Sequence, residues 1–254
     1  MMHDSARFLV DPVCMGGVGG SGTRVGAEIM QALGIYLGPL LNTAKDNFSF
    51  PPLASLLQEV ESEAERETIV FKGLAEFEHT MQENFLEQDQ QRYRSWGWKI
   101  PGSFYWLPYT SRYFPRMRYV HFMRHGLDMA FSGNRNQIKN WGWRFGIEHQ
   151  DPPTPEDLLA YWIAANNHAI ATASELLGDR FLLVDFDALC CQPETEVRRL
   201  GQFLQPDASE DEITGALALV HKPGSMQRYR KHDVRSRFAP ESIAAVEALG
   251  FTVE

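Results

Sequence analysis

The chain has 254 residues, of which 44% are hydrophobic, and it carries a formal net charge of −9. This length and composition support one substantial core, so we expect residues 1–254 to form a single domain. The negative charge argues against nucleic-acid binding, which uses a basic surface, and no stretch approaches the roughly 18 apolar residues of a membrane span.

The first predicted strand, near residues 9–16, runs into a glycine-rich turn. The turn contains Gly16, Gly17, Gly19, Gly20 and Gly22, with Ser21, Thr23 and Arg24 among them. Glycines let successive backbone N–H groups converge on an anion, and a following helix adds its free N-terminal amides. Apolar residues at helical spacing do follow: Val25, Ile29, Ala32, Leu33 and Tyr36. The turn therefore predicts a phosphate cradle, against the plainer alternative of a surface loop.

The glycines of this turn have the spacing of the standard nucleotide-binding P-loop, but the lysine of that pattern is missing. Gly17 and Gly22 have the spacing of G-x-x-x-x-G-K-[ST], but Thr23 stands where that pattern needs lysine. A standard triphosphatase is therefore disfavoured. A P-loop kinase of a small metabolite stays open as an alternative, although no acidic strand end for magnesium is evident.

Further strands are predicted near residues 68–72 and 96–100, and Lys72 and Lys99 lie at or beside their carboxyl ends. Strands near 118–123 and 181–185 follow, with a helix from about 156 to 177 between them. Arg124 ends the strand at 118–123, and Ser132 comes eight residues later on the next predicted helix. Buried strands separated by helices predict a mostly parallel sheet covered on both faces, a three-layer α/β fold with ligands at the strand carboxyl ends.

A basic cluster lies in residues 222–237. It consists of Lys222, Arg228, Arg230, Lys231, Arg235 and Arg237. On an acidic chain such a cluster predicts either a basic flap over an anionic ligand or a solvated tail. The three cysteines, Cys14, Cys190 and Cys191, lack metal-site spacing, and the N-terminus lacks the apolar core of a secretion signal. We therefore expect no metal, reduced thiols and a cytoplasmic location.

Together the glycine-rich turn and the strand ending in Arg124 resemble sulfotransferases that use 3'-phosphoadenosine 5'-phosphosulfate (PAPS). The pattern G-x-x-[RK]-S-G-T of that family is matched by Gly17, Ser21, Gly22 and Thr23, whereas Gly20 replaces its basic residue. Arg124 and Ser132 keep the spacing of the family's arginine and serine that bind the 3'-phosphate. A guanidinium suits that role because it grips phosphate through two parallel hydrogen bonds.

The resemblance implies a P-loop NTPase-like fold and sulfuryl transfer from PAPS to a hydroxyl or amine of a small molecule or carbohydrate. Residues 225–230 are similar to the S-x-x-R-[WY]-R segment with which bacterial members close over the nucleotide. The implied cofactor-binding residues are Gly19, Gly20, Ser21, Gly22, Thr23, Arg24, Arg124, Ser132, Arg228 and Arg230. Because Gly20 departs from the pattern, a non-catalytic nucleotide-binding relative stays open as an alternative.

Sulfuryl transfer needs a cation near the transferred group and a base for the acceptor proton. Lys99 matches the lysine of the family's K-x-P element and is our candidate for the cation. Lys45, Lys72 and Arg24 are alternatives that would replace the charge missing at Gly20. Asp46 and His79 lie in the neighbourhoods where branches of the family carry a catalytic acid or histidine, so both are candidates for the base. For each of them a surface role is the alternative.

Aromatic side chains gather in residues 96–109 and 141–145. Aromatic walls suit sugar rings and phenols alike, so these stretches predict an acceptor pocket, with a place in the core as the alternative.

Overall fold

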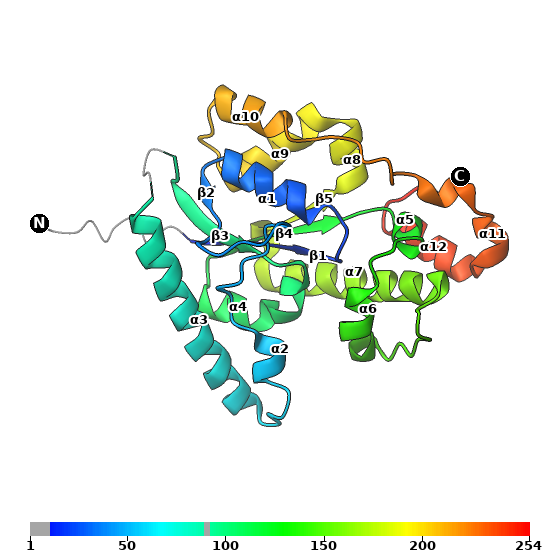
Figure 1. Cartoon of the computed structure of the whole chain (residues 1–254), viewed down its shortest axis with the longest axis horizontal. Coiled ribbons are helices and arrows are strands. Elements are labelled where there is room, and N and C mark those ends of the chain that lie inside the picture. Colours follow the sequence, from blue (N-terminus) through cyan, green and yellow to red (C-terminus); the bar gives the residue numbers. More distant parts are fainter. Residues whose placement is uncertain (1–10, 89–91) are drawn as a thin grey trace, which may run out of the picture.

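The computed structural model describes residues 11–88 and 92–254 and has three layers (Figure 1). Its sheet contains β1 (Val13–Gly17), β2 (Ile35–Tyr36), β3 (Ser95–Lys99), β4 (Arg118–Met123) and β5 (Phe181–Asp185). All neighbouring strands are parallel, in the order β2-β3-β1-β4-β5. The predicted α/β fold with a parallel sheet between helices is therefore confirmed.

One face of the sheet is covered by α1 (Thr23–Ala32), α8 (Phe186–Cys191), α9 (Pro193–Leu204) and α10 (Glu210–Leu217), above the sheet in Figure 1. The opposite face is covered by α3 (Glu63–Leu86), α4 (Leu107–Tyr113) and α7 (Pro155–Leu177). The shorter elements are α2 (Leu53–Leu56), η2 (Pro101–Trp106), α5 (Gly126–Ala130), α6 (Asn136–Trp141), η3 (Gly142–Phe145), η4 (Gly178–Arg180), η5 (Arg228–Lys231), α11 (Val234–Arg237) and α12 (Pro240–Ala248). No helix within the described ranges is long and apolar enough to cross a membrane.

Both faces of the sheet are buried, as parallel strands require. In β4, Val120 and Phe122 pack toward α1 and α9, whereas Tyr119 packs into the cluster on the opposite side. Successive side chains of a strand point to opposite faces, so a strand with core on both sides becomes a continuous apolar run. This pattern made the strands at 96–100, 118–123 and 181–185 predictable to within one residue.

The predicted strand at 68–72 is wrong, because these residues lie inside the helix α3. The buried residues of α3 are Val70, Leu74, Phe77, Met81 and Phe85. They recur every three or four residues, which places them on one face of a helix. This longer period outweighs the strand preference of the β-branched and aromatic residues at 68–71. Lys72 is consequently an exposed helix residue and does not lie at the edge of the sheet.

The other difference concerns β2, where helical spacing had suggested that the first helix extends to Tyr36. Instead α1 ends at Ala32, and Gly34 adopts a φ of 79° that redirects the chain. Ile35 and Tyr36 then pair with β3. Two residues are too few to show an alternating pattern. The strand predicted near 9–16 is observed from Val13, and residues 9 and 10 lie outside the described part of the chain.

Candidate active site

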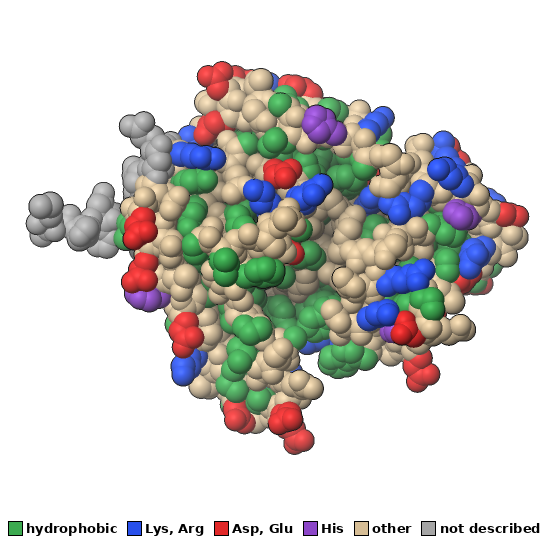
Figure 2. Space-filling model, in the orientation of Figure 1, with side chains coloured by type: hydrophobic (Ala, Val, Ile, Leu, Met, Phe, Trp, Pro, Cys, Tyr) green, Lys and Arg blue, Asp and Glu red, His purple; other side chains and the backbone are tan. Residues whose placement is uncertain are grey.

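A cavity of about 590 Å³ opens at the carboxyl ends of β1 and β3. The glycine-rich turn lines it with Gly19, Gly20 and Gly22, and the first turn of α1 adds Thr23 and Arg24. The other lining residues include Glu28, Ala44, Asp46, Lys99, Pro101, Asn134, Phe186 and His221. In the same orientation as Figure 1, Figure 2 shows this face hollowed near its centre, with Lys and Arg side chains above the hollow and to its right.

The glycine-rich turn is built to present hydrogen-bond donors. Gly20 and Gly22 have φ values of 99° and 89°, in the left-handed region that glycine adopts readily. The helix α1 starts at Thr23 without a side-chain cap, so the amides of its first turn have no helical acceptor. Ser21 is fully buried, and its hydroxyl has no partner in the described part of the chain. Buried donors without acceptors fit an anion such as phosphate.

The same geometry explains the departure at Gly20. Besides the positive φ, a Cβ atom added there would lie 3.1 Å from Cε of Met129. The backbone of this turn therefore disfavours any side chain at position 20. A basic side chain in this cavity therefore has to come from another position.

Lys99, at the end of β3, brings a basic side chain to the cavity. Its side chain is 1% exposed, and its ammonium donates to Oδ1 of Asp46 at 2.5 Å and to the Ala44 carbonyl at 2.7 Å. Burial lowers the pKa of Lys99, and the contact with Asp46 opposes that shift. An ammonium has three donors, so one N–H of Lys99 is left for a ligand.

The loop that carries Asp46 is held by Asn42. The side-chain oxygen of Asn42 accepts from the amides of Ala44 and Asp46, each at 2.8 Å. The Asn42 side-chain nitrogen donates to Oδ2 of Asp46 at 2.9 Å. Both carboxylate oxygens of Asp46 are thus engaged, one by Asn42 and one by Lys99, which fixes the carboxylate beside the cavity.

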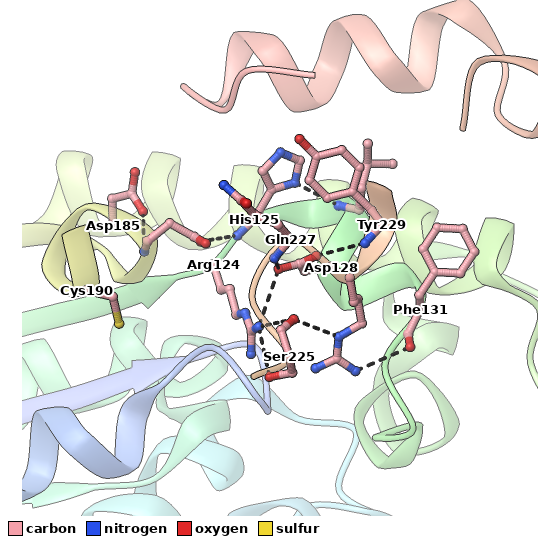
Figure 3. A network of polar contacts seen from close by, with 12 residues as sticks. Arg124, His125, Asp128, Phe131, Asp185, Cys190, Ser225, Gln227 and Tyr229 are labelled. Carbon is pink, nitrogen blue, oxygen red and sulfur yellow. Dashed lines mark hydrogen bonds and ion pairs between the residues drawn. The ribbon is translucent and has the colours of Figure 1, made fainter. Parts of the chain in front are cut away.

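Arg124, at the end of β4, connects the sheet to the segment of residues 222–231. It is 5% exposed, and its Nη2 donates to the Ser225 carbonyl at 2.8 Å and to the Ser225 hydroxyl at 3.1 Å (Figure 3). The ring of Phe186 lies 5.4 Å from the guanidinium carbon. The Nε of Arg124 is buried without a partner among the described residues. Arg124 therefore keeps a donor for a ligand while it anchors this segment.

Asp128 is the second anchor of that segment. It is fully buried and accepts from the amides of Gln227 at 2.7 Å and Tyr229 at 3.2 Å, as Figure 3 shows. Arg228 donates to the carbonyls of Ser225 and Phe131 in the same network. The predicted flap is thus tied to α5 at its centre, and Arg228 lies near Arg124.

Neither Arg124 nor Arg228 lines the cavity, and other predicted site residues also lie apart from it. Arg230 is exposed and pairs with Glu254. Ser132 does not line the cavity, and its hydroxyl accepts from the Asn134 amide at 3.2 Å. Lys45 also does not line it, although both its neighbours in sequence do.

The prediction of His79 as a base depended on a strand at 68–72, after which His79 would lie near the edge of the sheet. That position is wrong, because residues 68–72 and His79 all belong to α3. His79 lies in the middle of α3 with 70% of its side chain exposed, and its Nε2 is 3.2 Å from Glu83. It does not line the cavity. Conversely, Glu28 and His221 line the cavity and were not predicted. Glu28 follows Arg24 by one helical turn, a spacing that could have identified it, whereas His221 has no comparable signal.

Replacement of Gly22 by alanine is expected to destabilise the protein. The added Cβ would lie 2.1 Å from Cδ2 of the buried Phe186, at a backbone φ of 89°. Strain and overpacking together should lower the free energy of unfolding by about 2 kcal/mol, measured by urea denaturation. Gly215→Ala is the matched control, because Gly215 lies inside α10 with nothing within 4 Å of its added Cβ. That change should raise stability by about 0.5–1 kcal/mol; equal effects of the two changes would contradict the prediction.

Comparison with known proteins agrees with this architecture. A model of the sulfotransferase family matches residues 13–210. The sulfotransferase domain of the olefin synthase from Synechococcus PCC 7002 superposes with a TM-score of 0.55 at 15% identity, covering 96% of this chain and 95% of that chain. The sulfotransferase domain of the curacin biosynthetic pathway gives 0.55 at 11% identity, with 96% and 99% coverage.

Sulfotransferase STF9 from Mycobacterium avium gives a TM-score of 0.52 at 13% identity, covering 99% of this chain and 80% of that chain. No curated protein sequence matches the chain. At these identities the solved structures establish the fold, and the family model establishes the family. The resemblance seen in the glycine-rich turn and at Arg124 is confirmed, and with it the predicted class of enzyme: the chain belongs to the sulfotransferase family.

Proposed function

We propose that this protein transfers a sulfuryl group from PAPS to a hydroxyl or amine of a small-molecule or carbohydrate acceptor. One observation carries the proposal: a single cavity joins the free amides of the glycine-rich turn to the Lys99–Asp46 pair. The first feature fits an anionic donor, and the second fits a reaction that needs a cation and a base.

The donor is expected to bind through its two phosphate-bearing ends. The amides of Gly19, Gly20 and Gly22 to Arg24 and the Ser21 hydroxyl suit the 5'-phosphosulfate, whereas the Ser21 amide donates to the Val18 carbonyl at 3.0 Å. Arg124 suits the 3'-phosphate. Arg228 donates to the same Ser225 carbonyl as Arg124 and also to the carbonyl of Phe131, which precedes Ser132 in the sequence. The unpartnered buried donors, Ser21 Oγ and Arg124 Nε, support this assignment because a bound phosphate would supply the acceptors that they lack.

Lys99 and Asp46 have different roles in the proposed reaction. A bond forms between the acceptor oxygen and sulfur while the bond from sulfur to the phosphate oxygen breaks, and adenosine 3',5'-bisphosphate leaves with the negative charge. Lys99 and Arg24 stabilise that charge. Asp46 takes the acceptor proton, since its carboxylate lines the cavity and its side chain is 24% exposed. Asp46 is thus favoured over His79 as the base.

The test compares nucleotides by calorimetry and then follows transfer of labelled sulfate from PAPS. Adenosine 3',5'-bisphosphate should bind at least tenfold more tightly than ATP or adenosine 5'-monophosphate. Tighter binding of ATP would favour the kinase alternative. Nucleotide binding without transfer to any member of a broad acceptor panel would favour a non-catalytic relative. The cytoplasmic location, the single-domain organisation and closure of residues 222–237 over the nucleotide stay predictions.

A further inference from the structure

A second cavity, of about 470 Å³, lies on the side of the sheet covered by α3 and α7. It is lined by Arg66, Tyr105, Trp143, Arg144, Phe145 and His168. These residues come from α3, η2, η3 and α7, and Figure 1 shows α6, which continues into η3, and the N-terminal end of α3 on the lower side of the molecule. Aromatic rings and two arginines thus meet in one hollow.

Arg144 is held by aromatic rings instead of by a carboxylate. Its guanidinium carbon lies 5.1 Å from the ring centres of Tyr105, Trp106 and Trp141, and 5.4 Å from that of Trp143. Its Nε is buried without a hydrogen-bond partner, and no carboxylate of residues 11–88 or 92–254 forms an ion pair with it. Stacking on rings orients a guanidinium and leaves its charge uncompensated.

Arg66 adds a second uncompensated charge to the cavity. Its Nη1 donates to the Val60 carbonyl at 2.6 Å, and it has no ion pair with any described carboxylate. The acidic residues of the same helix end, Glu63 and Glu67, lie 3.8 Å and 3.4 Å from Arg112 on α4. On a protein with a net charge of −9, two arginines that form no ion pair with a described carboxylate indicate a site for an anion in this cavity.

The two cavities lie at opposite ends of η2. Pro101, its first residue, lines the cavity that contains Lys99, and Tyr105, near its last, lines the cavity that contains Arg144. A 3₁₀-helix rises about 2 Å per residue, so these four steps cover roughly 8 Å. A separation of this size is comparable to the length of a phenol that carries a short acidic side chain.

We propose that the acceptor carries an acidic group, which Arg144 and Arg66 bind in the second cavity while the acceptor hydroxyl lies at Lys99 and Asp46. This inference rests on the proposed function and narrows its acceptor to anionic ring compounds, such as phenols with a carboxylate side chain or uronic acid glycosides. Trp143 and Phe145 then contact the apolar part of the acceptor.

The experiment uses matched probes that differ only in charge: 3-(4-hydroxyphenyl)propanoate against its amide, and a methyl glucuronide against the methyl glucoside. Binding to the protein saturated with adenosine 3',5'-bisphosphate is measured by ligand-observed NMR, and kcat/KM is measured with PAPS. We expect the wild type to prefer at least one charged probe by roughly tenfold in both measurements. Arg144→Gln and Arg66→Gln should each reduce that preference to within about twofold, and Arg144→Lys should keep part of it.

Arg116→Gln is the matched control, since it removes an exposed arginine that pairs with Asp11 and does not line the cavity, and it should keep the full preference. Unchanged binding of adenosine 3',5'-bisphosphate verifies that each variant is folded. The proposal is overturned if no charged probe binds the wild type better than its neutral counterpart, or if the preference persists in the Arg66→Gln/Arg144→Gln double variant. Charge-dependent binding without sulfate transfer would instead support this site and count against the proposed reaction.

Discussion

Replacing Lys99 by methionine should lower turnover by about two to three orders of magnitude, the usual effect of removing one group that stabilises transition-state charge. Methionine keeps the length and most of the apolar volume of the buried side chain, so the change removes mainly the ammonium. The affinity for adenosine 3',5'-bisphosphate should change far less, because its phosphates are expected to bind at the glycine-rich turn and at Arg124. The measurement is kcat with labelled PAPS beside calorimetric binding.

Lys72→Met is the control for Lys99→Met, because Lys72 is an exposed lysine of α3 that does not line the cavity. It should leave turnover unchanged. If Lys99→Met keeps turnover within a factor of two of the wild type, Lys99 does not stabilise the transition state. Arg24 then becomes the candidate for the stabilising cation, because of the alternatives to Lys99 it alone lines the cavity.

The pH dependence of the wild type offers an independent check on Lys99. Burial lowers its pKa from the ordinary value of 10.5. Only the protonated form is a cation, so turnover should fall as the pH rises through this lowered pKa, and the fall should begin below pH 10.5. Lys99→Met should remove this alkaline limb from the profile of its residual activity. An alkaline limb that persists unchanged in the variant would assign it to another group.

The parts of the site that were predictable are those in which the chemistry requires a residue type at a fixed spacing. The glycine-rich turn is an example, because only glycine fits φ values near 90° at Gly20 and Gly22. Arg124 is another, because it follows an apolar strand whose end is visible in the sequence. The lysine of β3 was predictable for the same reason. In each case local sequence determines both the backbone and the chemical group.

The parts that were not predictable depend on contacts between distant segments. Asp128 accepts from amides about one hundred positions later in the chain, and nothing in the residues around Asp128 indicates those partners. Arg144 faces Arg66 only because η3 and α3 border the same cavity. The misplaced His79 has a different origin. A short β-branched and aromatic run at 68–71 looks like a strand until the burial period of the whole helix is considered.

Replacing Arg124 by alanine should weaken binding of adenosine 3',5'-bisphosphate by roughly 30- to 1000-fold, because a charge-assisted contact to the 3'-phosphate is lost in a desolvated site. Arg124 also bonds to Ser225, so the change disturbs the segment of residues 222–231. Adenosine 5'-monophosphate separates the two effects. It lacks the 3'-phosphate but would contact the same segment, so its affinity reports the disturbance alone.

The informative quantity is therefore the ratio of the two affinities, measured by calorimetry for the wild type and for Arg124→Ala. We expect adenosine 3',5'-bisphosphate to lose most of its advantage over the monophosphate in the variant. Arg235→Ala is the control, since Arg235 belongs to the same basic cluster but donates to the Val253 carbonyl at 3.1 Å; it should leave the ratio unchanged. If both nucleotides weaken equally in Arg124→Ala, the guanidinium serves to hold residues 222–231 in place, and the 3'-phosphate is bound elsewhere.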